Sequence, residues 1–272
     1  MKSWKLFSLF LILISIAAML LSREPGEEHI VVIVETDKAV MEFPVEQYLL
    51  GAMAAVTDPE YESECQKALA VLLRGNLMRN RQGEEMEIKT EEPYYDFGMR
   101  RQLYGEYQQE YEQRLEEAIA ATSGLIAVSD NQILEGNFHA LSAGVTRDTA
   151  DSGSVVCNQS MEAEDFFYQK EYTIEKIGDI GEIRRDPAGY TESIEVNGKV
   201  FSGEYFREQF QLPSANFDIE RKEGNYLITV RGKGHGLGMD LYYANELAKQ
   251  GWSYHQILDY FFKDFILKKI IV

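Results

Sequence analysis

The chain has 272 residues, of which 45% are hydrophobic, and this is enough to bury a core in one large domain or two small ones. Its 45 acidic and 27 basic residues give a formal net charge of −18, and the acidic residues are spread along the chain. A surface of this sign repels phosphate backbones and anionic lipid headgroups, which argues against nucleic acid as a partner. A solvated acidic surface on an exported protein accounts for the charge, which names no function by itself.

Residues 1–28 are predicted to form a cytoplasmic tip, a transmembrane signal-anchor and a short linker. Lys2 and Lys5 precede an apolar run from Leu6 to Leu21. The run is longer than the ~7 to 15 residues of a cleaved signal peptide, and no small-residue cleavage site follows it. We therefore favour a single-pass anchor in the cell membrane over a cleaved signal, with residues 29–272 outside the cytoplasm as one ectodomain.

The first part of the ectodomain is predicted to contain a hairpin and three helices. Residues 30–34 and 38–43 have the pattern of paired strands. Apolar residues at spacings of three and four predict helices over 45–56, from Asp58 to about Leu77, and 106–122. Asp58 is expected to cap the second helix, and the charged residues 82–92 are expected to form a surface loop.

The remaining residues are predicted to alternate between strands and helices. Strands are expected over 125–128, 133–139, 217–220 and 226–230, and within the glycine-punctuated residues 155–203. Helices are expected over 204–210, 241–249 and 254–262, the last of them capped by Ser253. The predicted fold class is therefore α+β, a single extracytoplasmic domain of mixed helices and antiparallel strands.

The cysteine and histidine pattern gives no support for a metal or another cofactor. No CxxC or HExxH spacing occurs, and the four histidines lie far apart in the sequence. Cys65 and Cys157 could form one disulfide outside the membrane, but the sequence does not show whether their backbones come within bridging distance.

Two segments bring small residues next to a histidine. Residues 231–239 place four glycines around His235 directly after a strand, in a pattern that fits neither a Walker loop nor the dinucleotide fingerprint. His235 either positions a polar substrate or satisfies neighbouring carbonyls in a tight turn. Residues 138–144 carry His139 and Ser142, but Ser142 lacks the Gly-x-Ser-x-Gly elbow and the orienting acid that acyl transfer requires.

Seven segments, in order, resemble the stage II sporulation protein D family, which includes the amidase enhancer LytB. They are residues 43–55, 67–74, 102–104, 121–124, 138–144, 201–203 and 234–239. The resemblance implies a protein on the outer face of the membrane of endospore formers, acting on peptidoglycan during forespore engulfment. It implies a lytic transglycosylase that cuts stem-peptide-free glycan strands, beside an amidase and a membrane scaffold protein.

The resemblance also implies a set of substrate contacts. They are Arg74, Gln102, Tyr104, His139, Ser142, His235, Gly236, Gly238 and Met239. Tyr94, Tyr95 and Phe97 either stack on sugar rings with Tyr104 or belong to the core.

The family's catalytic acid is a glutamate just after the small-residue stretch, and the alignment through residues 67–74 puts Val56 at that position. Valine cannot donate a proton, so this resemblance predicts a member that binds glycan or stimulates an amidase with impaired catalysis. Leu241 and Tyr243, in place of a glutamine and a glycine of the family pattern, point the same way. The alternative is an active lytic transglycosylase that uses Asp58 or Glu60 from a rearranged loop.

Overall fold

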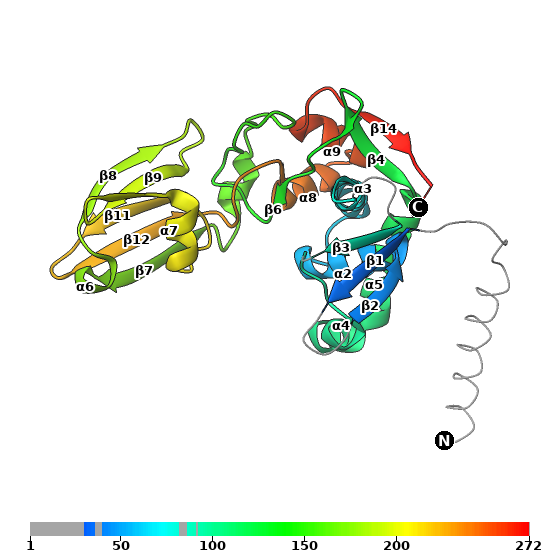
Figure 1. Ribbon diagram of the computed structural model, residues 1–272, viewed down its shortest axis with the longest axis horizontal. Coiled ribbons are helices and arrows are strands. Elements are labelled where there is room, and N and C mark those ends of the chain that lie inside the picture. The colour runs from blue at the N-terminus through cyan, green and yellow to red at the C-terminus, as the bar shows by residue number, and fades with distance from the viewer. Residues whose placement is uncertain (1–29, 36–39, 82–85, 91, 272) are drawn as a thin grey trace, which may run out of the picture.

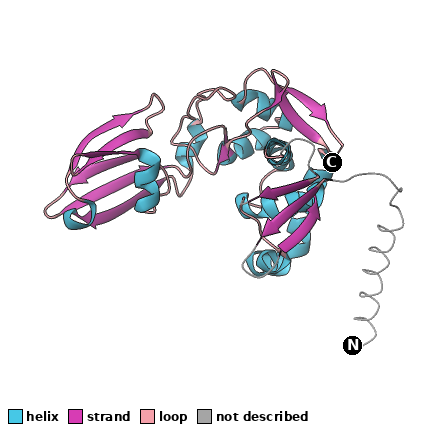
Figure 2. Ribbon diagram, in the orientation of Figure 1, coloured by secondary structure: helices cyan, strands magenta, loops and turns pink. Residues whose placement is uncertain are grey.

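The computed structural model describes residues 30–35, 40–81, 86–90 and 92–271 (Figure 1). Helices and mostly antiparallel sheets are mixed along the chain, which confirms the predicted α+β class (Figure 2). The predicted membrane anchor lies outside the described residues. Within those residues, no helix has both the length and the apolar character needed to cross a membrane.

The described part of the chain begins with the predicted hairpin. Strands β1 (Val31–Glu35) and β2 (Val40–Pro44) pair antiparallel, with Val32 opposite Phe43. Strand β3 (Glu87–Thr90) pairs parallel to β1 on its other edge, so the prediction of a loop over residues 82–92 was wrong there. The strand carries one buried apolar residue, Ile88, and a single apolar residue gives no periodic signal.

Four helices pack beside this sheet. They are α2 (Val45–Val56), α3 (Ser63–Arg79), α4 (Phe97–Tyr104) and α5 (Gln108–Ala121), with a short 3₁₀ turn η1 (Gly105–Tyr107) before α5. Helix α3 begins at Ser63 and not at Asp58, so the predicted start was wrong. Asp58 instead accepts a hydrogen bond from the Glu60 amide at 2.9 Å, which closes a turn between α2 and α3.

A second sheet and two helices complete this part of the molecule. Strands β4 (Leu125–Ser129), β5 (Gln132–Ile133) and β14 (Ile266–Lys269) form the sheet in the order β14, β4, β5. Helices α8 (Leu241–Lys249) and α9 (Tyr254–Phe261) pack against α3, and Ser253 caps α9 in a capping box, as predicted. Strand β14 was not predicted.

Residues 167–231 form a separate lobe, here called the distal lobe (Figure 1). It contains β7 (Phe167–Thr173), α6 (Ile174–Ile177), β8 (Ile180–Arg185), β9 (Thr191–Val196), β10 (Lys199–Ser202), α7 (Gly203–Gln209), β11 (Phe217–Arg221) and β12 (Asn225–Arg231). Two three-stranded antiparallel sheets, β10-β9-β8 and β11-β12-β7, enclose a hydrophobic cluster of the lobe's own residues.

The other described residues, here called the main body, share a larger hydrophobic cluster. The distal lobe is an insertion in this body, because the chain leaves at Phe166 and returns at Gly232, whose amide donates to the Phe166 carbonyl at 2.9 Å. The 3₁₀ turn η2 (Asn158–Glu162) lies near the exit. The prediction of one ectodomain stays a prediction.

A short parallel pairing joins the segment before the insertion to the segment after it. Strand β6 (Phe138–His139) pairs with β13 (Met239–Asp240). The four glycines between residues 232 and 238 have positive φ angles. A Cβ atom on Gly238 would lie 1.9 Å from the Asn137 carbonyl oxygen, so glycine is required for the two segments to touch.

An ion pair in the interior joins α2 to α3. The guanidinium of Arg74, whose side chain is fully buried, donates to both carboxylate oxygens of Glu46, at 2.9 and 2.8 Å. It also donates to the Leu125 carbonyl at 2.9 Å. Arg74 therefore stabilises the fold, and its buried side chain is not accessible to a ligand.

Removing the carboxylate of this pair is expected to destabilise the protein strongly. Glu46→Ala leaves a buried guanidinium without its counter-charge and should lower the free energy of unfolding by about 3 to 5 kcal/mol. Urea unfolding of residues 30–272 measures the change. Glu246→Ala, which removes the exposed pair with Lys249, is the control and should change it little. Equal effects of the two variants would contradict the structural role of Glu46.

Two substitutions separate the energetic cost of the close contact at Gly238 from the cost of its left-handed backbone conformation. Gly238 (φ 68°) and Gly198 (φ 73°) share the left-handed conformation, but a Cβ on Gly198 meets no atom within 4 Å. Gly198→Ala should therefore cost only the backbone strain, about 1 to 2 kcal/mol. Gly238→Ala should cost about 1 to 3 kcal/mol more, the range for forcing atoms into filled space. Urea unfolding compares the two, and equal costs would show that the segments do not need the contact.

Candidate functional site

The turn between α2 and α3 follows Val56, the residue that the sequence resemblance predicts at the position of a catalytic acid. Val56 is the last residue of α2, is partly buried, and packs against the main hydrophobic cluster. The Val56 side chain is thus directed partly to the core, and it has no acidic proton.

Both carboxylates that follow Val56 are already bonded within the protein. Asp58 accepts from the Glu60 amide, and Glu60 accepts from the Tyr111 hydroxyl at 2.6 Å. This bond is the largest cause that raises the pKa of Tyr111 to about 12. Arg114 donates to the Glu60 and Tyr61 carbonyls at 3.3 and 3.2 Å, which fixes the backbone of the turn.

The turn lies close to the segment that carries Asp240. Burial is the main cause of the raised pKa of Tyr61, but the charges of Asp58 and Asp240 both add to it. The Glu62 amide also donates to the Asn245 side chain at 2.7 Å. The fold therefore brings the turn after Val56 near Asp240 and α8.

His139 and His235 lie together between the two glycine-containing segments, with ring centroids 5.8 Å apart. Burial is the first cause that lowers the pKa of His235, to about 4, and the neighbouring His139 lowers it further. Burial also lowers the pKa of His139, whereas Asp240 acts in the opposite direction. Both rings are therefore neutral at pH 7 and can donate or accept a hydrogen bond, but neither is a proton donor of acid strength.

The hydrogen bonds of the two rings define what each can offer. His235 Nδ1 accepts from the Leu237 amide at 3.0 Å, which leaves Nε2 with the proton. His139 Nδ1 lies 3.0 Å from the Leu237 carbonyl, to which it donates in the neutral state. Its Nε2 then accepts, and it is buried without a hydrogen-bond partner among the described residues.

Asp240 is fully buried and organises the segments around it. One carboxylate oxygen accepts from the Ser142 amide at 2.9 Å and from the Ser160 hydroxyl at 2.6 Å, and the other caps α8 through the Tyr243 amide. Ser142 is itself fully buried, and its hydroxyl accepts from the Gly144 amide at 3.2 Å. These contacts give Asp240 and Ser142 structural roles.

A cluster that sequence patterns did not reveal joins the distal lobe to His235. Arg147 donates to Asp186 at 2.6 Å and to the His235 carbonyl at 3.2 Å, and its guanidinium lies 5.3 Å from the ring centre of Tyr190. Glu204 is near enough to raise the pKa of His235 against the other causes. Its carboxylate pairs with Arg207 at 2.7 Å and lies 3.6 Å from Arg147.

The other predicted contacts are spread over different environments. Gly236 packs on Tyr190, since a Cβ there would lie 2.3 Å from the ring, and Met239 is fully buried. Gln102 is exposed on α4. Tyr104 is buried, and this burial is the main cause that raises its pKa to about 12. The charge of Asp58 also raises it. The influence of Asp58 places Tyr104 near the turn after Val56.

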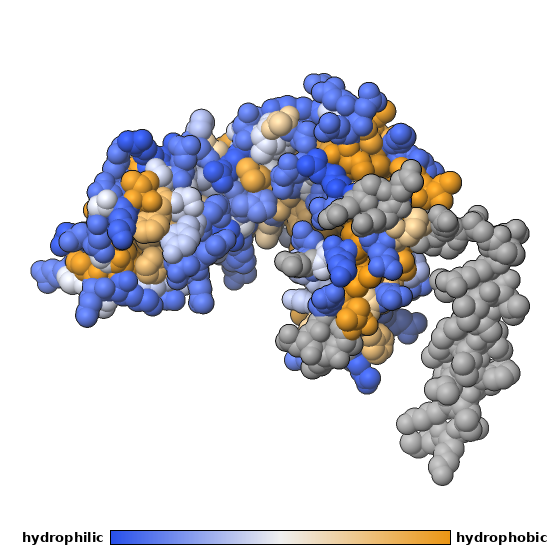
Figure 3. Space-filling model, in the orientation of Figure 1, coloured by the Kyte–Doolittle hydropathy of each residue, from blue (hydrophilic) through white to orange (hydrophobic). Residues whose placement is uncertain are grey.

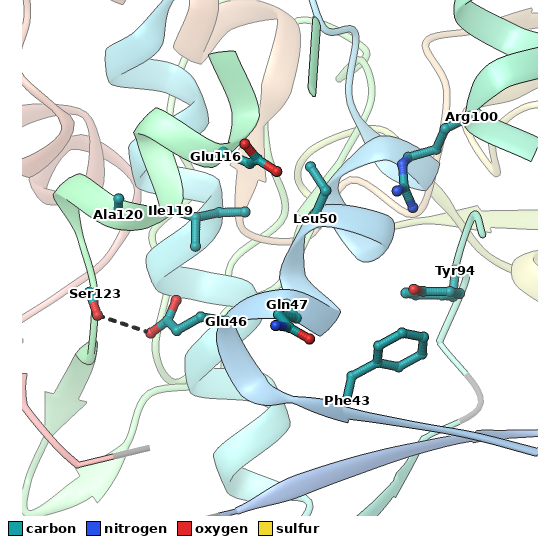
Figure 4. A pocket seen from close by; sticks show the side chains of 10 residues that line it. All are labelled: Phe43, Glu46, Gln47, Leu50, Tyr94, Arg100, Glu116, Ile119, Ala120 and Ser123. Atoms are coloured by element: carbon teal, nitrogen blue, oxygen red, sulfur yellow. Dashed lines mark hydrogen bonds between the residues drawn. The ribbon is translucent and has the colours of Figure 1, made fainter. Parts of the chain in front are cut away.

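A cavity of about 580 Å³ lies on another face of the main body, between α2, α4 and α5 (Figure 4). The rings of Phe43 and Tyr94 line one side of it, 5.2 Å apart. Its charged groups are largely engaged, since Glu46 binds Arg74 and Arg100 binds Glu112 at 2.7 Å. Of the residues considered above for sugar contacts, Tyr94 lines this cavity, and none of the nine contacts implied by the resemblance does.

The described residues include both cysteines and show whether metal-ligating side chains gather. Cys65 and Cys157 are both free and buried. Burial is the main cause that raises the pKa of both thiols. No group of three or more metal-ligating side chains is found in the part of the chain that the structure describes.

Comparison of the sequence with known proteins gives matches to stage II sporulation proteins. A family model described as stage II sporulation protein matches residues 35–128, which include α2, Val56 and α3. Over 84% of its length the chain is 26% identical to Stage II sporulation protein D of Bacillus amyloliquefaciens and 25% identical to that of Bacillus subtilis strain 168. The alignments cover 75% of each relative.

The similarity extends to a more distant bacterium. An uncharacterized protein of Brachyspira hyodysenteriae is 25% identical over 84% of this chain and 67% of its own length. The matches confirm the resemblance found in the sequence: the chain is similar to the stage II sporulation protein family over residues 35–128 and to two proteins named Stage II sporulation protein D over 84% of its length.

Proposed function

We propose that this protein is a membrane-anchored sporulation protein that binds glycan strands of peptidoglycan without cutting them. It would act outside the cytoplasm, held by the apolar run at its N-terminus, and would stimulate an amidase or join a membrane scaffold. The observation that carries the proposal is the apolar side chain of Val56 where the family has its acid.

Glycan cleavage needs an acid on the glycosidic oxygen, and the same group then acts as the base. Val56 cannot fill either role. Asp58 and Glu60 are two and four residues away, and their carboxylates accept hydrogen bonds inside the turn. A displacement of ~1 Å in the reacting group already lowers a rate severely, so neither carboxylate replaces the missing one.

Binding needs less from the site than cleavage does. The neutral imidazole of His235 can bond sugar hydroxyls and N-acetyl groups, whereas the Nε2 acceptor of His139 is buried and has no protein partner among the described residues. Glu204, the carboxylate near His235, pairs with Arg207 through Oε2, and its Oε1 is buried without a hydrogen-bond partner among those residues. The neutral histidines support the binding of a polar ligand.

Installing the acid should restore cleavage. Val56→Glu supplies a carboxyl at the family position, whereas Val56→Gln supplies the same size and polarity without an acidic proton. On glycan strands freed of stem peptides, Val56→Glu should form anhydro-sugar ends at least about 100-fold faster than either Val56→Gln or the unaltered protein. Chromatography of the released muropeptides measures the products.

Two results would contradict the proposal. Anhydro-sugar products formed by the unaltered protein, and lost in Asp58→Asn or Glu60→Gln, would show an active lytic transglycosylase with a substitute acid. Failure of residues 30–272 to sediment with insoluble sacculi at low and moderate salt would show that the protein does not bind glycan. Equal inactivity of Val56→Glu and Val56→Gln would show that more than the acid has been lost.

A further inference from the structure

Strand β14 combines exposed apolar and basic side chains at one edge of the second sheet. The sheet order β14, β4, β5 places it at the edge, where its partner among the described strands is β4. Ile266 is 66% exposed, and Ile271, two residues beyond the strand, is 93% exposed. Lys268 and Lys269 lie between them and are exposed as well. Figure 3 shows apolar side chains reaching the surface at the corner of the main body where Figure 1 places β14.

The charge of this edge is opposite to that of the whole protein. Residues 263–271 contain three lysines and one acidic residue, in a chain of net charge −18. Lys263 pairs with Asp148 at 2.8 Å, whereas neither Lys268 nor Lys269 forms an ion pair in the part of the chain that the structure describes. The edge therefore attracts anions locally, although the surface as a whole repels them.

A series of short contacts places this edge beside the start of β1. The Ile270 amide donates to the Gly124 carbonyl at 2.8 Å, and the Gly124 amide donates to Glu46 at 3.0 Å. Glu46 follows closely on Pro44, which pairs with Val31 at the start of β1. Figure 1 shows the end of β14 and the start of β1 at the same corner of the main body. The predicted anchor therefore joins the main body beside β14.

The linker to the predicted anchor is short. Residues 22–29 separate the apolar run from Ile30, and a fully extended chain of that length spans at most about 29 Å. In an anchored protein, the start of β1 and the neighbouring β14 edge are thus held close to the bilayer. Exposed apolar side chains next to lysines are the combination that binds the interface of an anionic membrane.

We propose that residues 266–271 form a lipid-binding surface that rests on the outer leaflet of the membrane and prefers anionic headgroups. The isoleucines would enter the interface, and Lys268 and Lys269 would contact the headgroups. The proposal rests on the anchored form of the proposed function and adds a second contact with the bilayer. A single anchor lets the main body turn about its linker, whereas a second contact fixes which of its faces is directed away from the membrane.

The test places the full-length protein in lipid nanodiscs and measures the surroundings of position 271. An Ile271→Cys variant carries the polarity-sensitive fluorophore NBD, which the buried Cys65 and Cys157 do not take up. In discs that contain phosphatidylglycerol, nitroxide-labelled lipids should quench this fluorophore, and acrylamide in the water should reach it poorly. The same fluorophore on Val40→Cys, 65% exposed at the other end of the β1-β2 hairpin, should show the reverse.

Charge substitutions separate the lysines of β14 from the charge of the whole protein. A lysine near an anionic leaflet contributes about fivefold to binding, so Lys268→Gln with Lys269→Gln should lower the ratio of lipid-contacting to water-exposed fluorophore about thirtyfold. Fluorescence lifetimes resolve the two environments. Lys199→Gln with Lys222→Gln removes the same charge from exposed positions of the distal lobe and should leave the ratio unchanged. Unfolding midpoints show that the variants are folded.

The possible failures differ. If the full-length protein enters the discs but the fluorophores at positions 271 and 40 are equally exposed to water, the lipid-binding surface is excluded and the proposed function stands. If position 271 is shielded from acrylamide without being quenched by the nitroxide lipids, another protein chain covers the edge and the surface is again excluded. Equal ratios with and without the lysines would overturn the preference for anionic headgroups. If the full-length protein does not enter the discs, the anchor and the lipid-binding surface are both overturned.

Discussion

The carboxylate of Glu46 is the interaction on which the arrangement of the main body depends. It accepts from Arg74, from the Gly124 amide at 3.0 Å and from the Ser123 hydroxyl at 3.5 Å, and Arg74 in turn binds the first carbonyl of β4. One buried charge pair thereby ties α2 to α3, to the end of α5 and to the second sheet. Because Glu46 lies in the first turn of α2, this pair also sets the direction of the helix that ends at Val56.

The glycine-rich segment shows how a pattern typical of ligand binding can serve the chain itself. Its glycines allow close approach, but the groups approached are the Asn137 and Leu141 carbonyls, the His139 Cβ atom and the Tyr190 ring. At these contacts the segment that follows the inserted lobe packs against residues 137–141 and against Tyr190 of the lobe. The pairing of His139 with His235 follows from this packing, so the site is built by the same contacts that attach the lobe.

Much of the fold could be predicted because its signals are local. The helices α2, α5, α8 and α9 carry apolar faces within one segment, and the Ser253 cap acts within three residues. Strands β3 and β14 could not, because each depends on a partner far along the chain. The boundaries of the distal lobe meet only in three dimensions, through the bond between Phe166 and Gly232.

The residues of the candidate site were also predictable only where a local motif contains them. His139, His235 and Val56 stand in motifs, whereas the contacts of Arg147 with Asp186 and His235 span 39 and 88 residues and leave no pattern in the sequence. Arg74 also lies in a motif, but its buried guanidinium is paired with Glu46. A motif thus indicates that a residue matters to a family without separating the residues that bind a ligand from those that hold the fold.

The proposed function depends on whether a neighbouring carboxylate could replace the acid that Val56 lacks. Asp58, Glu60, Glu204 and Asp240 are the carboxylates near the turn or the histidines, and each accepts a hydrogen bond or an ion pair from the protein. Asp240 is fully buried and accepts on both oxygens, so freeing it would cost about 1 to 3 kcal/mol for each lost partner, whereas Glu204 keeps Oε1 without a hydrogen-bond partner among the described residues. Under the proposed function, Val56 would separate binding from cleavage, because the neutral imidazole of His235 can bond a sugar and valine has no acidic proton to cut it.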